Sequence, residues 1–319
     1  MTTADRILVV VDPTSDEQPA LQRATDLARP AGGVIELFIC EYDQYLSGER
    51  FFDSVGLEKA RQALLGDARE RLDKLAEPLE KDGVEVTTDV HWDHPLDEGI
   101  VRKVLESKPD LVVKDTHYHP VLKRSIFSNT DWNLIRSCPA PLMLVKPKAF
   151  APKPIIVAAV DPLHEHDKPA DLDRVILKKA GELAQLFGGT LHVFHSFDPT
   201  PAIAGAATTM ATPIAVPVSE VTEALEQRHR EALEALLEGY DLPAEQVHMH
   251  QGTPQDLLPT LAEKRAADLV VLGAVSRSAL QRIFVGSTAE RVLDRLPCDL
   301  LIVKLESFTS RVSAEFGAA

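Results

Sequence analysis

Short apolar runs alternate with longer amphipathic segments along the whole chain. In the first half the apolar runs predict strands at Ile7–Val11, Val34–Cys40, Val84–Val90, Leu111–Lys114 and Leu142–Val145. In the second half they predict strands at Ile155–Val160, Thr190–His195, Val247–His250, Leu269–Leu272 and Leu300–Val303. Between the runs, apolar residues recur at helical spacing, as at Leu21, Ala24, Leu27 and Ala28. This alternation predicts α/β domains in which helices cover both faces of a parallel sheet.

The two halves of the chain are copies of one another. Residues 110–146 and 268–304 align without a gap and agree at 11 of 37 positions. The segment 146–154, KPKAFAPKP, carries three prolines and predicts a short, stiff linker between the copies. We therefore expect domains at 1–148 and 153–306, followed by a flexible polar tail at 307–319.

Charge and composition exclude several classes of protein. The net charge of -15 argues against a nucleic-acid partner, because a polyanion needs a basic surface. No apolar stretch reaches 18 residues, and the N-terminus lacks a signal-peptide pattern, so we expect a soluble cytoplasmic protein without a membrane partner. Three cysteines, Cys40, Cys138 and Cys298, fall in or beside apolar runs and are expected to be reduced.

A candidate anion site follows the fourth predicted strand of the second half. Gly273 and Gly286 would let the backbone approach a phosphate, and Gly286 would open a helix whose free N–H groups favour an anion. Hydroxyls of Ser287 and Thr288 would donate to phosphate oxygens, and Asp161 would accept from a ribose hydroxyl or a base amino group. The alternative is that both glycines only make tight turns and that Ser287 or Thr288 is only an N-cap.

These residues carry a family resemblance. Gly273-x2-Ser276-x9-Gly286-Ser287 resembles the G-x2-G-x9-G-[S/T] nucleotide motif of the universal stress protein family, and the first half resembles its tandem-domain branch. The resemblance implies two flavodoxin-like (adenine nucleotide alpha hydrolase-like) domains, each a five-stranded parallel sheet of order 3-2-1-4-5. It also implies stress protection with ATP or a related adenine nucleotide as ligand. Ser276 replaces a family glycine, and Arg277 offers a compensating charge for an outer phosphate.

The first copy lacks this motif. Asp115 stands at the position of Gly273, Tyr118 at that of Ser276, Ser128 at that of Gly286 and Asn129 at that of Ser287. A carboxylate about 4 Å from a phosphate costs a few kcal/mol, enough to remove ordinary micromolar binding. We therefore expect one nucleotide site per chain, in the second copy, with the first copy acting as a pairing or regulatory module.

Two further features leave alternatives open. His91, His94, His117 and His119 lie near predicted strand ends, but the ends of the third and fourth strands would be roughly 14 Å apart in the implied order, which argues against a shared metal. His117 and His119 are instead polar partners of a small ligand, or hydrated loop residues. Residues 199–219 carry no charge and are interpreted as a lid, as a surface buried between the halves, or as a loop.

Three functional classes fit the sequence. The chain is expected to be a nucleotide-responsive stress protein whose two domains pair within the chain, with a further homodimer open. The alternatives are a scaffold or carrier of an apolar metabolite, and a slow ATPase, for which the loop offers no evident general base or Walker lysine.

Overall fold

A computed structural model of the chain describes residues 5–47, 54–119, 124–126, 128–163, 171–209, 218–274 and 293–314. The chain forms two compact units. The first contains Met1–Ala149 together with Asp299–Ala319, and the second contains Phe150–Cys298. The crossing at Ala149 lies within the proline-containing segment 146–154 that was predicted to link the copies.

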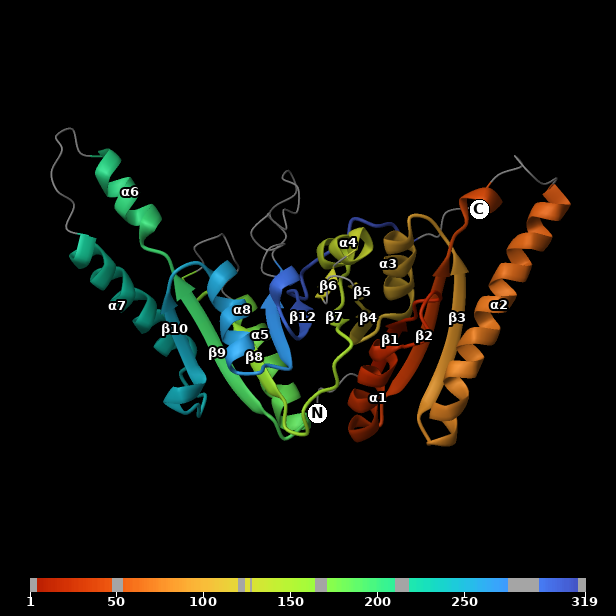
Figure 1. The fold of residues 1–319 in the computed structure, drawn as a ribbon, viewed down its shortest axis with the longest axis horizontal. Coiled ribbons are helices and arrows are strands. Elements are labelled where there is room, and N and C mark those ends of the chain that lie inside the picture. Colours follow the sequence, from red (N-terminus) through yellow and green to blue (C-terminus); the bar gives the residue numbers. More distant parts are fainter. Residues whose placement is uncertain are drawn as a thin grey trace. The chain divides into compact units, whose positions relative to one another are not determined.

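The first unit is built on a sheet of order β3-β2-β1-β4-β7-β12 (Figure 1). Its strands are β1 (Arg6–Val10), β2 (Val34–Glu41), β3 (Glu85–Trp92), β4 (Leu111–Asp115), β7 (Leu142–Val145) and β12 (Asp299–Val303). The first five are parallel and confirm the order 3-2-1-4-5. Ile7, Leu8 and Val9 follow one another in β1 and are all fully buried. Because successive strand residues point to opposite faces, both faces of the sheet are covered.

In the described part of the first unit, four helices and a 3-10 turn accompany this sheet. They are α1 (Pro19–Ala31), η1 (Gln44–Leu46), α2 (Ser54–Lys81), α3 (Leu96–Ser107) and α4 (Asn129–Ser137). Helix α1 begins with Pro19 and is capped after Ala31 by Gly32, whose φ of 68° is the left-handed conformation that glycine favours at a helix end. Proline and glycine thus set both ends of the first crossover helix.

Strand β12 comes from the end of the chain and runs antiparallel to β7, with Leu301 opposite Met143. By the repeat, β12 is the counterpart of β7 in the second copy, yet it is part of the first compact unit. Its first residue, Asp299, is 2% exposed and lies 2.8 Å from Nε of Arg23 on α1. Asp299 also accepts from the N–H of Lys146, so a buried ion pair fixes the start of the strand.

The second unit contains a parallel sheet of order β10-β9-β8-β11. Its strands are β8 (Ile155–Ala159), β9 (Thr190–Phe197), β10 (Val247–Gln251) and β11 (Leu269–Gly273). Its helical elements are α5 (Asp171–Leu186), α6 (Thr200–Thr209), α7 (Val218–Leu236), η2 (Ala244–Gln246) and α8 (Pro254–Lys264). The order repeats that of β3, β2, β1 and β4 in the first unit, which confirms the predicted fold class.

Two segments differ from the sequence-based expectation. Residues 117–119 and 124–126, expected within a loop, form an antiparallel hairpin of β5 (His117–His119) and β6 (Arg124–Ile126). The uncharged segment 199–219 is helical over α6, and α7 begins at Val218. Among the described helices, none combines the length and apolarity needed to cross a membrane. The three cysteines are free, and Cys138 and Cys298 are buried.

Candidate functional site

The second unit brings two predicted site residues to one edge of its sheet. Asp161 follows β8 and Gly273 ends β11, and these strands are parallel neighbours with Leu269 opposite Ile156. The chain leaves β8 towards β9 on one side and later enters β11 on the other, so β8 and β11 flank the switch point where ligands of such sheets bind. Five further predicted residues lie outside the described ranges: Ser276, Arg277, Gly286, Ser287 and Thr288.

The backbone at Asp161 is held from two sides. Its N–H donates to Oδ1 of Asp173, a fully buried residue in the first turn of α5, over 3.0 Å. The carbonyl of the preceding residue, Val160, lies 3.1 Å from Nδ1 of His195 on β9. The peptide group that begins Asp161 is therefore fixed at both its N–H and its C=O.

Gly273 is a glycine because helix α5 packs against it. A Cβ at this position would lie 2.6 Å from Cδ2 of Leu172 and 3.0 Å from Cδ1 of Ile176. Its φ lies outside the left-handed range, so packing and not backbone conformation requires the glycine here. The approach of a phosphate to this backbone stays a prediction.

In the first unit, side chains of the chain itself fill the corresponding edge. Asp12, at the end of β1, accepts from both the N–H and the hydroxyl of Thr14, at 2.8 and 2.6 Å. Asp115, at the end of β4, accepts over 2.6 Å from the N–H of Ala20. Ala20 is the first residue of α1 after Pro19 that has an N–H to offer, so the Asp115 carboxylate occupies the N-terminus of α1.

Helix α4, the counterpart of the helix that Gly286 would open, is closed by its own residues. Ser128 and Asp131 form a capping box, with the Ser128 N–H donating over 2.7 Å to Asp131. Nζ of Lys114 lies 2.8 Å from the fully buried Asp131 carboxylate. A carboxylate therefore takes the position that an anion would occupy at this helix start.

The second copy has none of the residues that form this network. Where the first copy has Lys114, Ser128 and Asp131, the aligned residues are Leu272, Gly286 and Ala289. The sequence comparison had identified the change at Ser128 but not those at Lys114 and Asp131. Their contribution becomes visible only through the ion pair that joins β4 to α4.

Burial raises the pKa of Asp115 to about 7; the Ala20 N–H opposes this, and Asp12 and Asp299 add to it. Because the folded-state pKa exceeds the unfolded value, the first unit loses stability as pH rises from about 4 through 7. We expect Asp115→Asn, which can still accept from Ala20, to raise the free energy of unfolding at pH 8 by about 1–2 kcal/mol and to leave it little changed at pH 4. Urea titrations at both pH values test this against Asp67→Asn on the exposed face of α2. Parallel pH profiles for wild type and Asp115→Asn would contradict it.

One group of possible metal ligands in the described part of the first unit contains a histidine. Ligand atoms of Asp89, His91 and Glu106 lie within 4.8 Å of one another, the one such group among the described residues. However, Nζ of Lys103 lies 2.6 Å from Asp89 and 3.7 Å from Glu106, so an ammonium already supplies the positive charge. His117 lies on β5, opposite Ile126 of β6 and apart from this group in the sequence.

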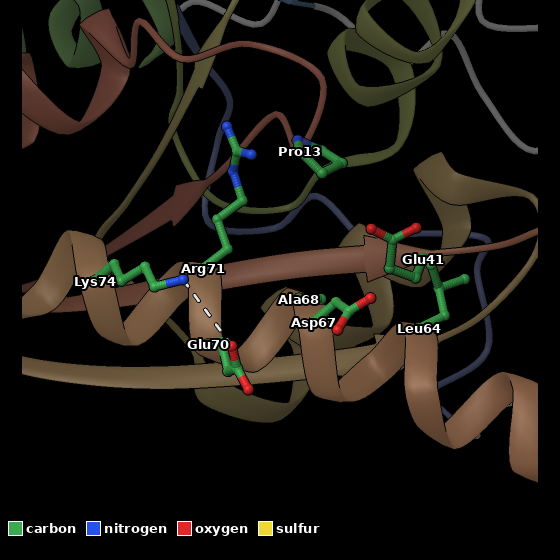
Figure 2. Close-up of a pocket in the computed structure, with 8 residues that line it drawn as sticks. All are labelled: Pro13, Glu41, Leu64, Asp67, Ala68, Glu70, Arg71 and Lys74. Atoms are coloured by element: carbon green, nitrogen blue, oxygen red, sulfur yellow. Dashed lines mark ion pairs between the residues drawn. The ribbon is translucent and has the colours of Figure 1, made fainter.

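A surface cavity of about 490 Å³ in the first unit was not predicted. It lies between Pro13, the end of β2 and helix α2. Figure 2 shows Glu41 and Asp67 at its wall and Arg71 extended towards Pro13. Burial raises the pKa of Glu41, and the nearby carboxylate of Asp43 raises it further. With three carboxylates and two cations around it, this cavity does not suit a polyphosphate.

Comparisons with known proteins agree with the geometry. The family model of the universal stress proteins matches residues 3–146 and 155–304. Universal stress protein E of Escherichia coli K12 is 30% identical over 321 residues, which cover 99% of this chain and 98% of the relative. A structure from Pseudomonas aeruginosa assigned to these proteins superposes with a TM-score of 0.74 at 28% identity, covering 96% of this chain and 95% of that one. A universal stress protein from Archaeoglobus fulgidus shares the fold, with a TM-score of 0.66 at 15% identity over 94% of this chain and 98% of that one.

Proposed function

Because this chain belongs to the universal stress protein family, we propose that its second unit binds ATP or a related adenine nucleotide and that its first unit does not. The observation that carries the proposal is the contrast between the two sheet edges. In the second unit, Asp161 and Gly273 lie at the switch point of the sheet. In the first unit, Asp115 and Asp131 place carboxylates at the starts of two helices.

The proposed site gives each residue a role. Asp161 accepts a hydrogen bond from a ribose hydroxyl or a base amino group. The contact with Asp173 holds the backbone of Asp161 in place for this role. Gly273 and Gly286 bring backbone N–H groups to the phosphates. Ser276, Arg277, Ser287 and Thr288 complete the phosphate contacts by hydroxyl donation and by charge.

We propose that the nucleotide acts as a signal rather than as a substrate, in a cytoplasmic stress-response factor. The first unit then binds no nucleotide and stays the same, while the second unit changes between its nucleotide-bound and nucleotide-free forms. A carrier of an apolar metabolite is the alternative, because helix α6, TPAIAGAATT, is uncharged. Mass spectrometry of small molecules released from the purified protein separates the two, since an adenine nucleotide supports the first and a lipid the second.

The nucleotide site is tested by Gly286→Asp. A carboxylate at a helix start that faces phosphates costs a few kcal/mol, so we expect affinity for ATP to fall by at least about a hundredfold while the circular dichroism spectrum is unchanged. Isothermal titration calorimetry measures the affinity. Gly66→Asp, a similar exchange at an open position on α2, is the matched control and should bind as the wild type does. Equal affinity in Gly286→Asp and wild type would remove the site assignment.

A further inference from the structure

Two histidines form a buried pair in the second unit, between β9 and α7. Nε2 of His195 lies 2.8 Å from Nδ1 of His229, and the two residues are 1% and 0% exposed. The rings stack with centroids 5.0 Å apart, and Phe197 stacks on His229 from the same strand as His195. The pair is therefore a packed contact between the strand and the helix.

The contact of His195 with Val160 fixes the direction of these hydrogen bonds. A backbone carbonyl can only accept, so Nδ1 of His195 carries a proton and donates to Val160. In the neutral ring Nε2 then has no proton, and it accepts from Nδ1–H of His229. A directed chain of hydrogen bonds thus runs from α7 through His195 to the peptide between Val160 and Asp161.

That peptide is held on its other side by Asp173, which accepts from the N–H of Asp161. Val160 C=O and Asp161 N–H belong to one planar group, so its orientation is set jointly by the histidine pair and by α5. The side chain of Asp161 is attached directly after this peptide group, where the chain leaves β8. A change in the pair is therefore transmitted to the residue that we place at the nucleotide.

The charges around the pair set how many protons it accepts. Burial lowers the pKa of His195; the Val160 contact opposes this, as do the carboxylates of Asp161 and Asp173, whereas His229 lowers it further. On α7, Glu226 and Arg230 flank His229 and pair with each other over 2.6 Å, both about half exposed. An added proton places a positive charge on rings that are 1% and 0% exposed, where water cannot solvate it while α7 stays packed on β9. A second proton would make two N–H groups face each other over the same 2.8 Å.

We propose that His195 and His229 are positioning residues for Asp161, and that uptake of a proton by the pair separates α7 from β9 and weakens nucleotide binding in acid. This inference rests on the nucleotide site proposed above. It assigns the second unit a response to pH as well as to nucleotide.

The test compares wild type with His229→Asn, whose amide can still donate to His195 but cannot take up a proton. ATP affinity of the full-length protein is measured by calorimetry at pH 7.5, 6.5 and 5.5. Dividing the wild-type affinity by that of the variant at each pH cancels the protonation of the ligand's own phosphates. We expect this ratio to fall about fivefold or more between pH 7.5 and pH 5.5, because a unit shift in pKa on binding corresponds to a factor of ten. A constant ratio would overturn the inference.

A second histidine pair supplies the control. Nδ1 of His192 lies 2.8 Å from Nε2 of His248, also buried, but His192 is three residues from His195 and faces the opposite side of β9. We expect His248→Asn to keep the wild-type pH dependence of ATP affinity. If His248→Asn removed that dependence as fully as His229→Asn, acid would be acting on the unit as a whole and the positioning role would fail.

Nuclear magnetic resonance tests the pair without any nucleotide. In the nucleotide-free protein we expect His195 to be protonated on Nδ1, and the amide resonance of Asp161 to shift with pH in wild type but not in His229→Asn. If no nucleotide binds at any pH and this shift is still seen, the proposed function fails and the coupling of the pair to Asp161 stands. If nucleotide binds and the Asp161 resonance ignores pH in both proteins, the coupling fails and the proposed function stands.

Discussion

Arg23→Ala is expected to lower the free energy of unfolding of the first unit by about 3–5 kcal/mol, because it leaves a buried carboxylate without its cation. Arg23 and Asp299 are 3% and 2% exposed, and Nη2 of Arg23 also donates to the carbonyl of Lys148 over 2.7 Å. Both tryptophans of the chain, Trp92 and Trp132, lie in the first unit, so tryptophan fluorescence during urea unfolding reports on this unit.

The matched control is Arg29→Ala, on the same helix. Arg29 pairs with Asp82 over 2.6 Å, but both side chains are more than half exposed, and such pairs contribute less than about 1 kcal/mol. Replacing both buried partners, as in Arg23→Met with Asp299→Leu, is expected to recover most of the loss. A loss in Arg23→Ala no larger than that in Arg29→Ala would show that the ion pair does not hold β12 in place.

The unmodified protein is expected to bind at most one nucleotide per chain, and removing the obstructions of the first unit should create a second site. Asp115→Gly, Tyr118→Gly and Ser128→Gly together remove one carboxylate and restore glycines to the motif positions. Adding Lys114→Leu and Asp131→Ala removes the remaining ion pair and capping box. We expect the triple variant to gain weak ATP binding and the fivefold variant to bind at least about tenfold more tightly than the triple variant, since the start of α4 is then no longer occupied by the Asp131 carboxylate.

The measurement is clearest in a Gly286→Asp background, where the site of the second unit has been removed. Calorimetric stoichiometry should then rise from none to one per chain as the five substitutions are introduced. Two sites of similar affinity in the unmodified protein would show that the first unit binds nucleotide without any substitution. No binding by the fivefold variant, if it remains folded, would show that the first unit lacks more than these five positions.

Most strands of the first unit could be predicted because they are apolar runs buried on both faces, as in Ile7–Val11. Strand β3 is an exception, since most of its residues are exposed or half-buried. The order of the strands in the sheet followed from the family resemblance and not from these runs. Strand ends were less accurate: β9 continues to Phe197, two residues beyond the prediction, because Phe197 packs against His229 on a helix distant in the sequence. The hairpin of β5 and β6 was missed, since its residues alternate neither in polarity nor at helical spacing.

For the candidate site, the nucleotide contacts that the sequence suggests stay predictions, and the structure adds physical reasons that the sequence does not show. Gly273 was interpreted as an opening for phosphate, whereas its space is needed by Leu172, one turn earlier along α5 than Ile176. Lys114 and Asp131 are ordinary charged residues in the sequence, and only folding brings them to 2.8 Å. The histidines of β9 lie within an apolar run, and nothing in that run indicates that His195 would pair with a helix 34 residues away.

The position of β12 has a consequence for synthesis of the protein. The ribosome makes residues 1–149 before Asp299–Val303, so the first unit emerges with the edge of β7 not yet covered by β12 and with Arg23 lacking its carboxylate. Until β12 is made, this edge presents free N–H and C=O groups to any other nascent chain. Truncated products that end within the second unit keep the edge permanently open. A premature stop codon far downstream of the first unit is therefore expected to turn that unit into a template for aggregation.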